Sequence, residues 1–231
     1  MAPNWFSKSG ISIGLVTFSL AVSSPVSLTL WQLSPQGLQP ATWQAASPVK
    51  SSPVNPPAQA EWNNGSVKLT STSGSWQSPD TWTVQNMEWS DLNHDGRVEL
   101  TLLVKRPFKP WPVDQFLPYG GRIKNHHDIA GNSSHIILIG WKKDHWGEVW
   151  AGSALARPVR MFTTADVNQD GIQELVVLEG DYDDTNVSQA SSLAIWKWDG
   201  FGFELVSRLE QPCRQFILTY SRQNEPLILL Q

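Results

Sequence analysis

Two short acidic segments of the chain share one pattern, and this repetition constrains the fold more than any other feature of the sequence. Trp89–Val104 and Thr164–Glu179 each contain Asp-x-Asn-x-Asp-Gly-x-x-Glu-Leu, followed by further apolar residues. A tight turn brings alternate residues of such a segment to its inner side, and the glycine permits the positive φ angle that the turn needs. A segment that recurs within one chain indicates a repeated structural unit.

The residue types at alternate positions of these segments predict calcium ligands. Calcium takes six to eight oxygen ligands, and carboxylates supply them best. Position 7 of each segment can offer only its backbone carbonyl. Three carboxylates held this close would repel one another without a cation, which favours a fold that forms around metal. The predicted ligands of two calcium ions are Asp91, Asn93, Asp95, Arg97 and Glu99 in the first segment, and Asp166, Asn168, Asp170, Ile172 and Glu174 in the second.

The EF-hand is the nearest competing motif. It requires an acidic residue at position 12 and a helix on either side. Position 12 here is Leu102 or Val177, and the flanks are rich in strand-forming residues, so the sequence excludes an EF-hand. The remaining alternative is a pair of hairpin turns that bind no ion.

Tryptophan-rich stretches accompany the acidic segments. His135–Trp150 and Leu193–Val206 alternate apolar and polar residues around a Lys-Asp or Asp-Gly turn, which is typical of β-hairpins. The sequence therefore predicts an all-β, β-propeller-like array of about three four-stranded units, each made of an aromatic hairpin, a third strand, the acidic loop and a fourth strand. The predicted units are Val67–Leu100, His135–Leu178 and Leu193–Leu230, and the third has Tyr220–Pro226 in place of the acidic loop, where we expect no metal.

Asp91–Leu100 and Asp166–Leu175 resemble the calcium loops of FG-GAP repeats, also called VCBS repeats, of integrin-α-type β-propellers. The resemblance is specific within these two stretches and loose over the rest of the domain. It implies calcium at the residues named above, on loops between the strands of a blade. It also implies an extracellular or periplasmic role in binding or adhesion, with a protein or a glycan as partner. Propellers have four to eight blades, so we expect an open or incomplete propeller, closure by further strands, or self-association that completes it.

The N-terminus has the composition of a targeting segment, residues 1–33. No charged side chain follows Lys8 until Lys50, and Ile11–Val22 is mostly apolar. A basic residue followed by such a run is typical of a secretory signal peptide. Extended to Leu33, the uncharged run is long enough for an uncleaved membrane anchor. Either alternative makes the domain extracytoplasmic, and we expect membrane contact only through residues 11–33.

Residues 34–60 are rich in proline, serine and glutamine, and this composition predicts a flexible linker. Residues 61–231 remain as the folded domain. The single cysteine, Cys213, excludes an intramolecular disulfide, so the core or bound metal must stabilise an exported domain. The net charge of −4 provides no basic field for nucleic acid, which we exclude as a partner.

An insert at residues 105–134 separates the first two predicted units. His126, His127 and Asp128 lie in it, and His135 follows, so these side chains could in principle hold a transition metal that activates water. The sequence contains no nucleophile elbow, phosphate-binding loop or dinucleotide fingerprint. We expect a non-catalytic binding module. The alternatives are an extracytoplasmic hydrolase with its site in the insert and a structural scaffold.

Overall fold

The computed structural model describes residues 28–42, 47–48, 55–109, 126–184 and 188–231, and these contain sixteen strands. No helix long and apolar enough to cross a membrane occurs among them. Residues 1–27, the larger part of the expected targeting segment, lie outside the described residues. The strands are β1 (Thr29–Ser34), β2 (Gly37–Pro40), β3 (Ser47–Pro48), β4 (Gln59–Asn63), β5 (Ser66–Ser71), β6 (Gly74–Gln77), β7 (Thr83–Ser90), β8 (Glu99–Pro107), β9 (Asn132–Lys142), β10 (His145–Ala151), β11 (Val159–Ala165), β12 (Glu174–Glu179), β13 (Ser192–Trp198), β14 (Phe203–Leu209), β15 (Phe216–Tyr220) and β16 (Pro226–Leu230).

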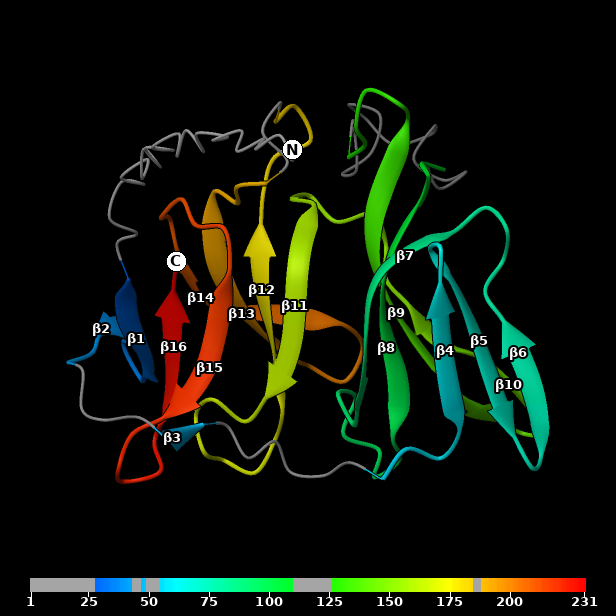
Figure 1. Ribbon diagram of the computed structural model, residues 1–231, viewed down its shortest axis with the longest axis horizontal. Coiled ribbons are helices and arrows are strands. Elements are labelled where there is room, and N and C mark those ends of the chain that lie inside the picture. Colours follow the sequence, from blue (N-terminus) through cyan, green and yellow to red (C-terminus); the bar gives the residue numbers. More distant parts are fainter. Residues whose placement is uncertain (1–27, 43–46, 49–54, 110–125, 185–187) are drawn as a thin grey trace, which may run out of the picture.

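The strands form four antiparallel sheets, which confirms the prediction of an all-β fold (Figure 1). We name them by their strands: the β4–β6 sheet, the β7–β10 sheet, the β11–β14 sheet and the β15–β16 sheet, the last with the order β2-β1-β16-β15-β3. Strand β6 contacts β10, β7 contacts β11, and β14 contacts β2. The sheets therefore follow one another in a row, with the β4–β6 sheet and the β15–β16 sheet at opposite sides of the view in Figure 1.

Three apolar clusters fill the spaces between neighbouring sheets. The inner strands supply them from both faces, because their side chains alternate between two buried environments. On β8, Leu102 belongs to the cluster shared with the β4–β6 sheet, and Leu103 belongs to the cluster shared with the β11–β14 sheet. On β12, Val177 and Val176 divide in the same way between the two clusters on either side of the β11–β14 sheet.

The predicted grouping of strands into units is wrong, although the predicted hairpins are present. Each acidic segment joins the first two strands of a sheet, and each tryptophan-rich hairpin forms the last two strands of the same sheet. The predicted units instead joined each aromatic hairpin to the acidic segment that follows it. The cause is the pairing of β8 with β9, in which Leu102 lies opposite Ile137, across the 105–134 insert. The insert therefore connects two strands of the β7–β10 sheet and does not separate two units.

The N-terminal boundary of the folded part also differs from the sequence prediction. The sequence predicts a targeting segment up to residue 33 and a linker at residues 34–60, yet β1 at the end of the first and β2 in the second are strands of the β15–β16 sheet. Thr29 pairs with Leu230, so the two ends of the described chain lie in one sheet. Leu30 and Leu38 are buried, and this burial offsets the entropy of ordering a polar, proline-containing segment.

Candidate metal-binding loops

The two acidic loops occupy equivalent places in neighbouring sheets. Strands β7 and β8 close the first loop with the pair Ser90 and Glu99, and β11 and β12 close the second with the pair Ala165 and Glu174. The position-9 glutamate of each loop is therefore the first residue of an inner strand. This placement buries Glu99 and Glu174, which are 2% and 1% exposed.

The backbone turns in the same way in both loops. Position 4 is left-handed in each, with φ of 58° at His94 and 64° at Gln169, and the glycines at position 6 have φ of 82° and 89°. The position-1 aspartate accepts a bond from the N–H of that glycine, at 3.1 Å in the first loop and 2.9 Å in the second. The sequence repeat is thus also a repeat of conformation, which glycine at position 6 makes possible.

Positions 3, 5 and 7 fix the turn through their own hydrogen bonds. Asn93 and Asn168 accept from the N–H at position 5, at 3.2 and 2.9 Å. The position-5 aspartates accept from the N–H of Arg97 and of Ile172, at 2.9 and 2.8 Å. Side-chain oxygens at positions 1, 3 and 5 therefore point toward the inner side of each loop.

In the first loop, Asp91, Asp95 and Glu99 each offer a carboxylate oxygen within 4.8 Å of the other two. Oδ1 of Asp91 and Oε2 of Glu99 are buried and have no hydrogen-bond partner among the described residues. Burial, together with the negative charges of Asp95 and Asp91, raises the pKa of Glu99 to about 8. Buried oxygens left without a donor are what a bound cation would satisfy, so this donor set fits a hard divalent ion.

In the second loop, an amide lies between the carboxylates. Nδ2 of Asn168 donates to Asp170 Oδ2 at 3.0 Å and to Glu174 Oε1 at 2.8 Å. Val167 N–H donates to the other oxygen of Glu174 at 3.0 Å. Burial, together with the charges of Asp170 and Asp166, raises the pKa of Glu174 to about 7, although the bond from Val167 N–H acts in the opposite direction. A cation at this loop would require Asn168 to turn its carbonyl oxygen inward.

The comparisons with known proteins add no family to this geometry. No protein-family model, curated protein or solved structure matches the chain.

The loop between β15 and β16 is the counterpart of the acidic loops in the third sheet. It is shorter, residues 221–225, and Asn224 has a left-handed φ of 64°, as position 4 of the acidic loops does. Ser221 stands in the position of the first aspartate and accepts from the N–H of Glu225 at 3.1 Å. A hydroxyl therefore makes the bonds that a carboxylate makes in the acidic loops.

Contacts between the loops were not foreseen from the sequence. Asp91 N–H donates to Gln173 Oε1 of the second loop at 3.2 Å, and Gln169 Nε2 donates to Asn224 O of the third hairpin at 2.7 Å. Gly140 was also missed, although a Cβ there would lie 3.0 Å from Cγ of Glu99. A glycine in the middle of an apolar strand was the available signal for such a close approach.

The histidines near the insert do not assemble a metal site. His135 is buried, with Nε2 at 2.7 Å from Ser133 Oγ and Nδ1 at 2.9 Å from Gly152 O, and burial lowers its pKa to about 4. Asp128 pairs with Lys105 at 2.5 Å. Among the residues that the structure describes, Asp91, Asp95 and Glu99 are the one group of three or more metal-ligating side chains of these types.

A cavity of about 410 Å³ borders the first loop. Glu99 lines it together with Trp141 and Trp146 of the aromatic hairpin and with Ser71 and Asn55 from the neighbouring sheet region. Trp146 Nε1 donates to Ser71 Oγ at 3.0 Å and so fixes one wall. An indole beside hydroxyl and amide groups offers both a stacking face and hydrogen bonds to a ligand.

Proposed function

We propose that this chain is an extracytoplasmic calcium-binding module of the FG-GAP or VCBS type, built as an open β-propeller-like array, which binds a protein or a glycan. The observation that carries the proposal is the first acidic loop, where two buried carboxylate oxygens lack a partner among the described residues. Ionised carboxylates are not kept buried without a counter-charge. A calcium ion would supply that charge and accept further oxygens from Asn93 and from the carbonyl of Arg97.

The two loops would differ in affinity for calcium. In the first loop the carboxylates already face one another. In the second, Asn168 bridges Asp170 and Glu174 and must exchange its amide nitrogen for its oxygen before an ion can enter. We therefore propose two calcium ions per chain, with the tighter one at the first loop.

Binding of a partner is the role that these surroundings favour over catalysis. The cavity beside the first loop joins a proposed calcium site to two indole rings and several hydroxyl groups. His127 and His135 are engaged in structural hydrogen bonds, which is evidence against the hydrolase alternative. A structural scaffold remains the second candidate, because the aromatic rings also pack the core. In this proposal, the apolar run Ile11–Val22 directs export, and self-association is a way to complete the open array.

Calorimetric titration of chelator-treated protein tests the metal assignment. We expect two calcium ions per chain, and the loss of the tighter one in Asp95→Asn. Asp80→Asn is the matched control, because Asp80 is an exposed aspartate outside both loops. Absence of calcium binding, zinc bound in preference to calcium, or an Asp95→Asn protein that still binds two ions would each refute the proposal.

A further inference from the structure

A second cavity, of about 360 Å³, lies between the β7–β10 sheet and the β11–β14 sheet. It extends to the start of β11 at Val159, the end of that strand opposite the second acidic loop. Protein interiors are packed to the density of organic crystals, and voids larger than a water molecule are few. A cavity of this volume lies in the range of small-molecule sites. Its apolar walls include Ile136, Trp150, Leu155, Val159, Trp196 and Phe203.

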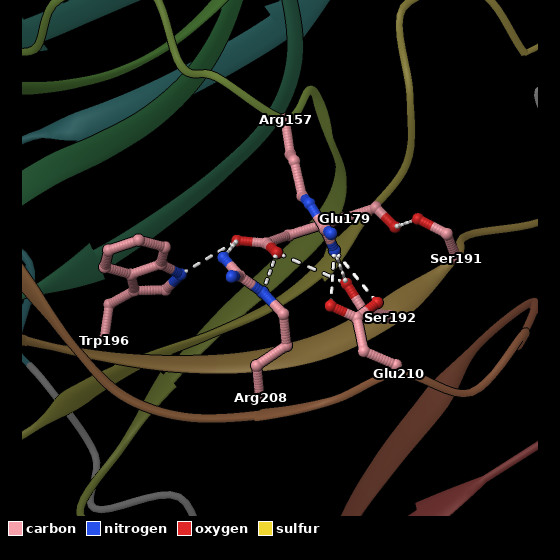
Figure 2. Close-up of polar contacts among 7 residues, drawn as sticks. All are labelled: Arg157, Glu179, Ser191, Ser192, Trp196, Arg208 and Glu210. Atoms are coloured by element: carbon pink, nitrogen blue, oxygen red, sulfur yellow. Dashed lines mark hydrogen bonds and ion pairs between the residues drawn. The ribbon is translucent and has the colours of Figure 1, made fainter.

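One edge of this cavity carries charged side chains that belong to a single network (Figure 2). Glu179 is 3% exposed, and both of its oxygens are saturated. Arg208 donates to them from Nε at 2.8 Å and Nη2 at 3.2 Å, and Trp196 Nε1 donates at 3.0 Å. Ser192 Oγ donates to the same carboxylate at 3.3 Å. Glu179 therefore neutralises Arg208 and has no capacity left for a ligand.

Arg157 stands at the same edge with a weaker counter-charge. Its Nη1 donates to Ser192 Oγ at 3.1 Å and to Glu210 at 3.0 Å, as Figure 2 shows. The side chain of Glu210 is 58% exposed, and an ion pair with so exposed a partner contributes little. Arg157 contacts Ser192 and Glu210 through Nη1, so Nε and Nη2 of the guanidinium are available to a ligand.

His126 provides one more polar group at this cavity. It lines the wall, and its Nδ1 is buried with no hydrogen-bond partner among the described residues. Buried polar atoms in native structures are nearly always paired, and an exception points to a missing partner. The cavity thus combines apolar walls, one weakly paired guanidinium and one ring nitrogen without a partner in the described part of the chain.

We propose that this cavity binds a small apolar carboxylate, whose hydrocarbon part lies between the two sheets and whose carboxylate replaces Glu210 on Arg157. Once Glu210 has left Arg157 for solvent, two guanidiniums face one buried carboxylate, and this excess positive charge selects an anion over a neutral or cationic group. The planar fork of arginine binds a carboxylate through two parallel hydrogen bonds. This site is separate from the acidic loops and does not depend on calcium.

Calorimetry with a matched pair of probes, indole-3-acetate and indole-3-acetamide, tests the proposal on the full chain. The two have nearly the same shape and differ in charge, so we expect the acetate to bind about tenfold more tightly, as one charge-assisted contact allows. Arg157→Gln should remove this preference and leave the binding of the amide unchanged. Arg160→Gln is the matched control, since Arg160 is a neighbouring arginine whose ion partner, Asp184, lies outside this cavity.

A second variant tests the position of the ligand. Ala154→Phe places a ring at the wall of the cavity and should abolish binding of both probes, while calcium binding and the melting temperature report that the fold is intact. Equal affinity for acetate and amide, loss of the preference in Arg160→Gln, or no binding of either probe at millimolar concentration would overturn the proposal. Unchanged binding in a folded Ala154→Phe protein would overturn it as well.

Discussion

Three glutamates lie almost fully buried at strand ends, and their surroundings assign them different roles. Glu179, at the end of β12, is neutralised by Arg208. Glu174, at the start of the same strand, receives Val167 N–H and the amide of Asn168. Glu99 has an oxygen with no partner among the described residues. Since an ionised carboxylate is costly to bury alone, the need for a cation is greatest at Glu99.

The substitution Glu99→Gln separates this need from ordinary packing. The folded pKa of Glu99, about 8, lies above its unfolded value near 4.5. Its protonated form therefore supports folding at low pH, and this support is lost as pH rises through 8. In chelator, wild-type protein should lose about 2 kcal/mol more stability between pH 6 and pH 9 than the variant, or about 4–8 °C in melting temperature. In millimolar calcium, wild-type protein should be more stable than Glu99→Gln, because only wild type keeps the full set of carboxylates for the ion. Thermal melts at both pH values measure this.

Glu148→Gln is the control for that comparison. Glu148 lies on β10 with an exposed side chain, so its substitution should change neither the pH dependence nor the effect of calcium. Equal behaviour of Glu99→Gln with and without calcium would mean that Glu99 binds no ion.

At the scale of elements, local patterns predicted the hairpins but not their assembly into sheets. The hairpins β9–β10 and β13–β14 follow from alternating residues around a turn, because both strands lie close together in sequence. The assignment of β8 to β9 depends on a pairing across the 105–134 insert. Alternation is satisfied equally well by either grouping of hairpins, so the sequence could not decide between them.

The N-terminal strand was missed for a related reason. The composition of residues 34–60 is that of a linker, and the partner of β1 is β16, at the other end of the chain. Pairing at such a separation leaves no local signal. Thr29–Leu33 was instead included in an apolar targeting segment, although these residues have the composition of a strand as well.

This strand gives a prediction by truncation. A chain that begins at Asn55 lacks β1, β2 and β3, loses the burial of Leu30 and Leu38, and exposes the edge of β16. Two buried leucines are worth about 4 kcal/mol or more, so the melting temperature should fall by about 10 °C. A chain that begins at Leu28 keeps all strands and should melt like the full chain. Identical melting of the two truncated chains would show that β1 does not support the fold.

The convergence of polar side chains in each loop was predictable from the sequence, and their individual contacts were not. Residue types at positions 1, 3, 5 and 9 identified the carboxylates and amides that converge in each loop. The amide of Asn168 between two carboxylates, and the bond from Asp91 to Gln173, depend on side-chain orientation and on the neighbouring sheet. A sequence pattern contains neither kind of information.

At the scale of the whole molecule, the three hairpin loops form a continuous row across three sheets. Figure 1 shows β11 and β15 running toward the same edge of the molecule, where the second and third loops follow them. Gln173 joins the second loop to the first, and Gln169 joins it to the third. The sheets are thus tied together at this edge by bonds between loops as well as by the apolar clusters between their faces.

This row predicts that the two proposed calcium ions bind cooperatively. An ion in the second loop orders Gln173, whose Oε1 then holds Asp91 N–H in place for the first ion. Asp95→Ala and Asp170→Ala each retain one intact loop, so each gives the calcium association constant of a single site. The coupling is the ratio of the product of the two wild-type association constants to the product of these two single-site constants. We expect the product of the wild-type constants to exceed the product of the single-site constants by about fivefold, which corresponds to one hydrogen bond of about 1 kcal/mol.

Gln173→Ala should reduce this factor to one, because it removes the connecting acceptor. Gln169→Ala, which breaks only the bond to the third hairpin loop, should leave it unchanged. A factor that persists in Gln173→Ala would mean that the coupling passes through the sheets and not through the loops.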